Sequence, residues 1–204
     1  MFKTNILIDL KSYLNISDGM LFQFILYIPF SLVILLPVFI TLKVRRQNFS
    51  SIGLKSDKAL KSIILGIVFS IPLVIPSIIS SVNRGMSLLS LPNLILLFLY
   101  FLLEIALVEE LSFRGFIQTR IQGLIKVKWL SIVIVGIMFA LMHIPFQMLL
   151  RDMKLVEFIK TDAIHLITTF VIHIYLVFLY TRDDNIICPT VAHLLINFVP
   201  SMFM

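Results

Sequence analysis

The chain has 204 residues, of which 59% are hydrophobic and only 14% are charged, and its mean hydropathy is +1.05. Soluble globular domains usually contain about 45–50% apolar and about 25% charged residues, so this composition excludes an ordinary soluble protein and predicts an integral membrane protein. The net charge of +6 indicates basic loops beside anionic lipid headgroups. We therefore expect the lipid bilayer as a partner, and no nucleic acid.

Apolar runs long enough to cross a bilayer recur along the chain, since a transmembrane helix needs about 20 such residues. We expect six spans, at about residues 20–42 and 62–82, then one that begins near Pro92 and runs into 101–116, and three more at about 129–143, 163–181 and 186–204. Pro145 is expected to disturb the fourth helix just after His143. The expected fold class is all-α: a polytopic membrane helical bundle of about six transmembrane helices. Nothing divides the sequence, so we expect one integral membrane domain over residues 1–204.

The basic residues predict which side of the membrane each loop faces. Placing the loop 43–61 in the cytoplasm also places 111–128 and 182–185 there, and that side then holds eleven of the seventeen lysines and arginines. Because basic loops favour the cytoplasm, we expect this orientation, with both termini outside.

Several polar side chains lie within the apolar segments, where each ionisable group costs roughly 2.5–3.5 kcal/mol on insertion scales. They are Glu104, Glu109, Glu110, His143, His173, His193 and Asn197. Glu110 and Arg114 are four residues apart, with the glutamate first, and this spacing favours an ion pair on one helical face. Glu109 lies about 100° further around the helix and can face elsewhere. Alternatively, the segment EELSFR is only the cytoplasmic end of the third span, solvated by headgroups.

The spacing of these residues predicts that they meet at one depth. If residues 93–122 form one helix and the chain turns at 123–128, the midpoint between Glu109 and His143 lies inside the turn. Equal rise along both arms then brings the two side chains to the same level, roughly 25 Å from the tip of the hairpin. His193 follows the polar turn at 182–185 by eight residues, or roughly 12 Å, and Asn197 shares its face. We therefore expect a site inside the bundle.

Three short motifs carry this site: EELSFR reads as EExxxR, FALMH as FxxxH and HLLIN as HxxxN. In this order and spacing they resemble the CPBP (Abi) family of membrane-embedded peptidases, which is related to the type II CAAX prenyl endopeptidase. The resemblance covers about residues 95–200. It implies an intramembrane endopeptidase, and some bacterial members of the family act in bacteriocin maturation, self-immunity or peptide signalling.

The resemblance also implies a role for each matched residue. Glu109 and His143 would activate a water for attack on a peptide carbonyl, and His193 and Asn197 would form the oxyanion hole. Amide hydrolysis needs such a base and such donors in any case. The remaining pair of the first motif, Glu110 and Arg114, would support these groups by ion pairing.

Whether a divalent metal takes part is open at this stage. Glu109, His143 and His193 could form a three-ligand zinc site. However, the chain lacks HExxH, and Asn197 is a poor zinc ligand but a good oxyanion donor. We therefore favour a metal-free mechanism.

The resemblance further implies a peptide or protein substrate in the membrane. The loop charges in turn predict an active site that opens toward the cytoplasmic side. We expect a bacterial plasma membrane. One alternative is a catalytically idle immunity or scaffold protein that binds a membrane partner such as an exporter or sensor. Another is a small proton-relaying transporter.

Four further residues fall outside the family pattern. We expect His173 to be a packed, hydrogen-bonded core residue, His165 to lie at the membrane interface and Cys188 to be a buried spectator. Glu104 is expected to be structural, with a supporting partner of Glu109 as the alternative.

Overall fold

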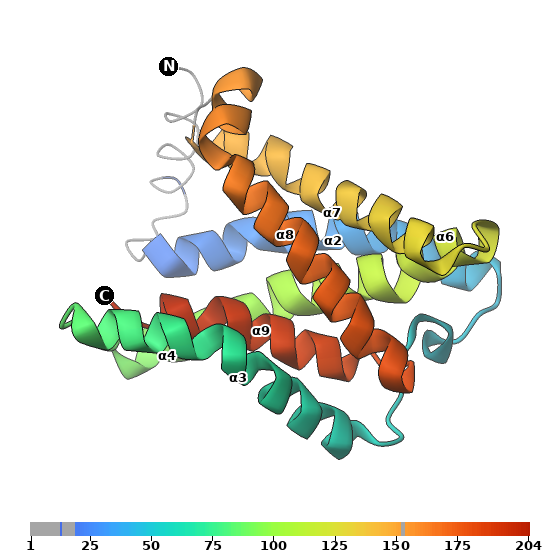
Figure 1. Ribbon diagram of the computed structural model, residues 1–204, viewed down its shortest axis with the longest axis horizontal. Coiled ribbons are helices and arrows are strands. Elements are labelled where there is room, and N and C mark those ends of the chain that lie inside the picture. Colours follow the sequence, from blue (N-terminus) through green and yellow to red (C-terminus); the bar gives the residue numbers. More distant parts are fainter. Residues whose placement is uncertain (1–12, 14–18, 152–153) are drawn as a thin grey trace.

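The computed structural model describes residue 13, residues 19–151 and residues 154–204, and these residues form a bundle of helices (Figure 1). The helices are α2 (Gly19–Val44), η1 (Phe49–Ile52), α3 (Ala59–Asn83), a composite helix over 91–124, α7 (Lys128–Arg151), α8 (Leu155–Asp183) and α9 (Ile187–Ser201). Within the described residues, five of these are long and apolar enough to cross a membrane, and α9 is a shorter apolar helix. The predicted all-α membrane bundle is confirmed. The N-terminal tail, which we expect outside, lies beyond the described residues apart from residue 13.

The composite helix alternates between α- and π-helical geometry. It comprises α4 (Leu91–Leu99), the π-helix η2 (Tyr100–Ala106), α5 (Leu107–Glu109), the π-helix η3 (Glu110–Gln118) and α6 (Thr119–Leu124). Its 34 residues reach at most about 50 Å at 1.5 Å per residue. This exceeds the roughly 30 Å hydrocarbon thickness, so the helix is long enough for part of the hairpin to stand above the bilayer, and that placement stays a prediction.

The apolar window of the fourth helix, Lys128–Pro145, matches the predicted span, but the helix itself ends later than predicted. Helix α7 does not stop near His143 but continues through Pro145 to Arg151. Transmembrane helices tolerate proline because neighbouring groups satisfy the freed backbone carbonyl.

Three loops gather at one end of the bundle, at the right of Figure 1: the α2–α3 loop, the α6–α7 turn and the α8–α9 turn. Lys55 Nζ lies 2.7 Å from Asp184 Oδ2, and Arg120 Nη2 donates to Gln47 Oε1 at 2.6 Å. The structure therefore agrees with the grouping of the loops 43–61, 111–128 and 182–185 on a common side.

A row of small residues brings α3 against α9, which is its main packing partner. Ser62, Gly66 and Ser70 follow each other at four-residue intervals and are buried. A Cβ atom on Gly66 would approach the carbonyl oxygen of Cys188 to 2.7 Å. Small residues at this spacing allow close backbone contact, which holds transmembrane helices together where lipid offers no hydrophobic contrast.

The α2–α3 loop docks beneath the first motif. Gly53 has φ +78°, a left-handed backbone conformation that glycine adopts without strain, and the preceding Ile52 is fully buried. A Cβ atom on Gly115 would overlap the carbonyl oxygen of Ile52. Glycine at 115 therefore permits the loop to lie directly against the helix that carries the glutamates.

This contact generates a stability prediction. We expect Gly115→Ala to destabilise the fold by about 1–3 kcal/mol, because overpacking against backbone atoms forces the loop away. The unfolding temperature of the purified protein in mild detergent would measure this effect.

Gly123→Ala is the matched control, because nothing lies within 4 Å of a Cβ at that helical position. It should be neutral or stabilising by about 0.5–1 kcal/mol through helix propensity. Equal unfolding temperatures for the two variants would show that the close contact at Gly115 is not needed.

Candidate active site

A cavity of about 620 Å³ lies inside the bundle, within the size range of small-molecule and peptide sites. Its walls come from α2, the composite helix, α7, α8 and α9. Most of the lining is apolar or aromatic. The ionisable or amide side chains among the described lining residues are Glu104, Glu109, His143, Gln147, His165 and Asn197.

The π-helical segments set the direction of the glutamates. In an α-helix, residues five apart lie about 140° apart around the axis. A π-helix has i→i+5 hydrogen bonds, so it brings such residues close to one face. Glu104 lies in η2 and Glu109 follows at i+5, and both side chains line the cavity. Glu110, one position further, is fully buried away from it.

Glu110 and Arg114 form the predicted ion pair. Arg114 Nη1 lies 2.9 Å from Glu110 Oε1, and both side chains are 0% exposed. The contact is an ion pair without hydrogen-bond alignment. The guanidinium also stacks 4.3 Å from the centre of the Phe139 ring. Two charges removed from water require such close partners, so this pair fixes the orientation of both side chains.

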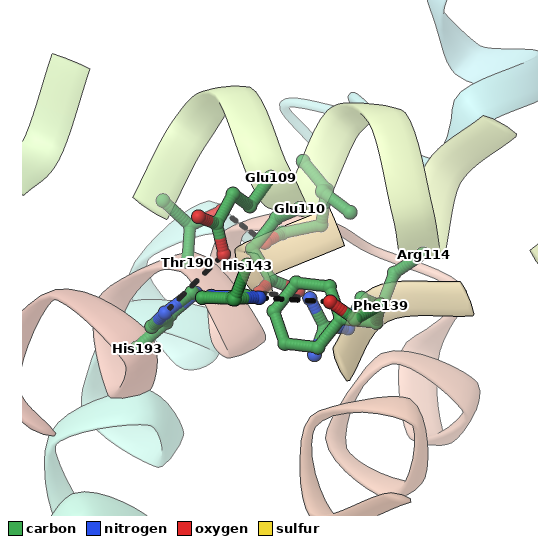
Figure 2. Close-up of polar contacts among 8 residues, drawn as sticks. Glu109, Glu110, Arg114, Phe139, His143, Thr190 and His193 are labelled. Atoms are coloured by element: carbon green, nitrogen blue, oxygen red, sulfur yellow. Dashed lines mark hydrogen bonds and ion pairs between the residues drawn. The ribbon is translucent and has the colours of Figure 1, made fainter. Parts of the chain in front are cut away.

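His193 connects the pair to Glu109. Its Nδ1 donates to Glu110 Oε1 at 2.8 Å, and its Nε2 lies 3.8 Å from Glu109 Oε2. Figure 2 shows this ring facing both carboxylates from α9. His193 is buried and does not appear among the described residues that line the cavity, whereas Asn197, one turn further along α9, does.

His143 is held by its own helix. Its Nδ1 donates to the carbonyl oxygen of Phe139 at 2.8 Å (Figure 2). A neutral ring with hydrogen on Nδ1 has its lone pair on Nε2, where it can accept a proton. The ring of Phe139 also packs edge-on against His143, with centroids 5.0 Å apart. The FxxxH spacing thus positions a potential base at the cavity.

The structure brings together the residues that the three motifs predicted. Glu109, His143 and Asn197 line one cavity, and His193 contacts Glu109 from behind it. Their roles in catalysis stay predictions, because geometry alone does not establish them.

Two residues that we expected to be peripheral also reach the cavity. Glu104 lines it, and its Oε2 accepts a hydrogen bond from Ser31 Oγ at 3.2 Å. His165 lines it from α8, with its ring centroid 6.2 Å from that of His143. Of these two residues, only Glu104 could have been suspected from the sequence, because it is a carboxylate in an apolar run that no motif explains. His173, by contrast, is fully buried against Phe139, as a packed core residue would be. Its predicted hydrogen bonding is wrong, because neither ring nitrogen has a hydrogen-bond partner among the described residues.

The suggested zinc ligands lie near one another, since His193 Nε2 is 3.8 Å from Glu109 Oε2 and His143 lines the same cavity as Glu109, but their arrangement does not meet the needs of a metal ion. Among residue 13, residues 19–151 and residues 154–204, no group of three His, Cys, Asp or Glu side chains is arranged to hold a metal ion. A catalytic zinc needs about three protein ligands. As they are arranged, Glu109, His143 and His193 do not form such a site.

Comparison with known proteins adds one match. The family model described as "Type II CAAX prenyl endopeptidase Rce1-like" matches residues 91–199, more than half of the chain. Comparisons with curated proteins and with solved structures found no match. The matched range runs from the start of α4 almost to the end of α9 and includes all three motifs. The family is one of CAAX-type endopeptidases, and this chain, with its apolar helices, belongs to it as an integral membrane member.

Proposed function

We propose that the protein is an intramembrane endopeptidase that hydrolyses a peptide bond of a membrane-associated peptide or protein. The observation that carries the proposal is the convergence of Glu109, His143 and Asn197 on one cavity within the bundle. Amide hydrolysis needs a carboxylate, an imidazole and an amide donor. Here one nitrogen of the imidazole is already hydrogen-bonded, which leaves the other for the reaction.

In the first step, Glu109 and His143 activate a water between them. Glu109 lines the cavity, so its carboxylate can accept a proton from a water held there, while its Oε2 atom is buried beside His193. His143 orients the same water through Nε2, since its Nδ1 is bonded to Phe139. The hydroxide attacks the carbonyl carbon while the water proton moves to Glu109.

In the second step, Asn197 and His193 stabilise the oxyanion. Preorganised donors are most effective in a site from which water is largely excluded. Because Nδ1 of His193 donates to Glu110, its Nε2 can donate to the oxyanion only when both ring nitrogens carry hydrogen. The C–N bond then breaks as Glu109 returns the proton to the leaving amine, and the cleavage consumes one water.

Glu110 and Arg114 act as positioning residues in this proposal. Arg114 holds the Glu110 carboxylate, and that carboxylate holds the ring of His193. Neither residue needs to touch the substrate. Their effect on catalysis would pass through the orientation of His193.

We propose a mechanism without a metal and substrate access from the cytoplasmic side of a bacterial plasma membrane. The first point is supported by the arrangement of the described His, Cys, Asp and Glu side chains, no three of which are grouped to hold a metal ion. The second is supported by the basic loops at the end of the bundle where the composite helix turns into α7. The physiological role that we propose is the processing of a membrane peptide, as in bacteriocin self-immunity.

The two residues that activate water, Glu109 and His143, generate the first functional prediction. We expect Glu109→Gln and His143→Ala each to lower the cleavage rate by about 10²–10⁴-fold, the usual contribution of general acid–base catalysis. Purified variants in proteoliposomes with internally quenched apolar peptides would provide the measurement, with and without a metal chelator.

Glu157→Gln is the control, because Glu157 is exposed in the first turn of α8. A chelator should leave the wild-type rate unchanged. Loss of activity that zinc restores would contradict the metal-free step. If Glu109→Gln kept full biological activity in cells, an idle scaffold that binds a membrane partner would replace the peptidase.

The oxyanion donor gives a separate prediction. Asn197→Ala should lower kcat by about 10²–10³-fold with little change in KM, because the donor acts mainly in the transition state. Steady-state kinetics on the same peptides would test it. Ser201→Ala is a control on the same helix, since Ser201 is exposed and donates only to the backbone oxygen of Asn197. An unchanged kcat in Asn197→Ala would remove this residue from the oxyanion hole.

The positioning pair is tested by comparing stability with activity. Glu110→Leu should destabilise the protein by about 3–5 kcal/mol, because Arg114 is left buried without a counter-charge. Adding Arg114→Met should restore most of that stability. Activity should stay low in the double variant because His193 has lost its acceptor.

Thermal unfolding in detergent and peptide cleavage would be measured on the same preparations. Recovery of activity together with stability in the double variant would reduce the pair to a purely structural role.

A further inference from the structure

The cavity contains a second carboxylate that the proposed mechanism does not use. Glu104 is 7% exposed and lines the cavity together with Glu109. The π-helical turn between them places both on one face of the composite helix. An unused ionisable group at membrane depth is a candidate for ligand recognition.

The Glu104 carboxyl group has no cationic counterpart within the described part of the protein. Among the described residues, the carboxylate is hydrogen-bonded only to the Ser31 hydroxyl, and none of the described lining residues is a lysine or an arginine. The two other buried glutamates differ, because Glu110 is paired with Arg114 and Glu109 lies beside His193. Buried charges in proteins are normally paired, so the partner of Glu104 is expected on a ligand.

We propose that Glu104 determines substrate specificity by binding a cationic side chain, lysine or arginine, of the peptide that occupies the cavity. This inference deepens the proposed peptidase function and rests on it. The aromatic lining fits the same group, since Tyr27, Phe30 and Phe101 surround this part of the cavity and aromatic faces attract cations. A substrate with an acidic residue at that place would meet only like charges.

The position of the cation follows from the spacing of the two glutamates. Glu109 follows Glu104 by five positions along the helix, which corresponds to about 7 Å along the axis at 1.5 Å per residue. An extended peptide advances about 3.3 Å per residue. The basic residue therefore lies about two residues from the scissile bond.

The class of ligand is tested by binding, independently of cleavage. The probe is a fluorescently labelled ten-residue peptide of leucine and alanine with one central lysine, compared with peptides that carry norleucine or glutamate instead. Anisotropy is measured with the Glu109→Gln protein in detergent, which holds the peptide uncut. We expect the lysine peptide to bind at least about tenfold more tightly than the norleucine peptide, as for a desolvated charge pair.

Three substitutions, each made in the Glu109→Gln background, separate recognition from folding. Glu104→Gln should abolish the preference for lysine, Glu104→Asp should retain it, and Glu157→Gln on the exposed surface of α8 should not change it. Thermal unfolding verifies that each protein is folded. The inference is overturned if norleucine binds as tightly as lysine, or if Glu104→Gln discriminates as well as its parent.

The position is tested with the wild-type protein by moving the lysine along the peptide and identifying the products by mass spectrometry. We expect the cleavage site to follow the lysine at a distance of about two residues, with no such dependence in Glu104→Gln. A fixed cleavage site would overturn the inferred register. If the lysine preference appears in binding but the wild type cuts no peptide, the proposed peptidase function fails while the cation site stands.

Discussion

The buried ion pair between Arg114 and Glu110 is the constraint on which the rest of the site depends. Both side chains are fully removed from solvent, and an isolated charge there would cost several kcal/mol. The Phe139 ring covers the guanidinium, and His193 donates to the carboxylate. Through these two further contacts the ion pair ties the composite helix to α7 and α9. These three elements carry every residue of the three motifs.

Two adjacent glutamates can serve different purposes because the helix points them in different directions. Glu110 faces the packed interior, where a cation neutralises it, and Glu109 faces the cavity, where one of its oxygens has no hydrogen-bond partner within the described residues. The first supplies rigidity, and the second supplies an acceptor for a proton. A rigid support for a reactive group is what preorganised electrostatic catalysis requires.

Much of this arrangement could be predicted from the sequence, because it depends on quantities that a sequence contains. The equal length of the two arms of the hairpin placed Glu109 and His143 at one level, and the four-residue spacing of Glu110 and Arg114 predicted their pairing. The alignment of Glu104 with Glu109 could not be predicted, because an α-helix would point the two side chains in different directions. No residue pattern predicts the π-helical turn that aligns them. The contribution of α2 through Tyr27 and Ser31 depends on how distant helices pack, and so does the position of His165.

The short α9 has a consequence for the surrounding lipid. Its 15 residues extend about 22 Å at 1.5 Å per residue, which is less than the roughly 30 Å of hydrocarbon that a spanning helix must match. A bilayer responds to such hydrophobic mismatch by thinning locally. Headgroups and the hydration that accompanies them would then come nearest to the protein beside the helix that carries His193 and Asn197. The shortness of α9 would thereby shorten the path by which a water molecule reaches a reaction centre within the membrane.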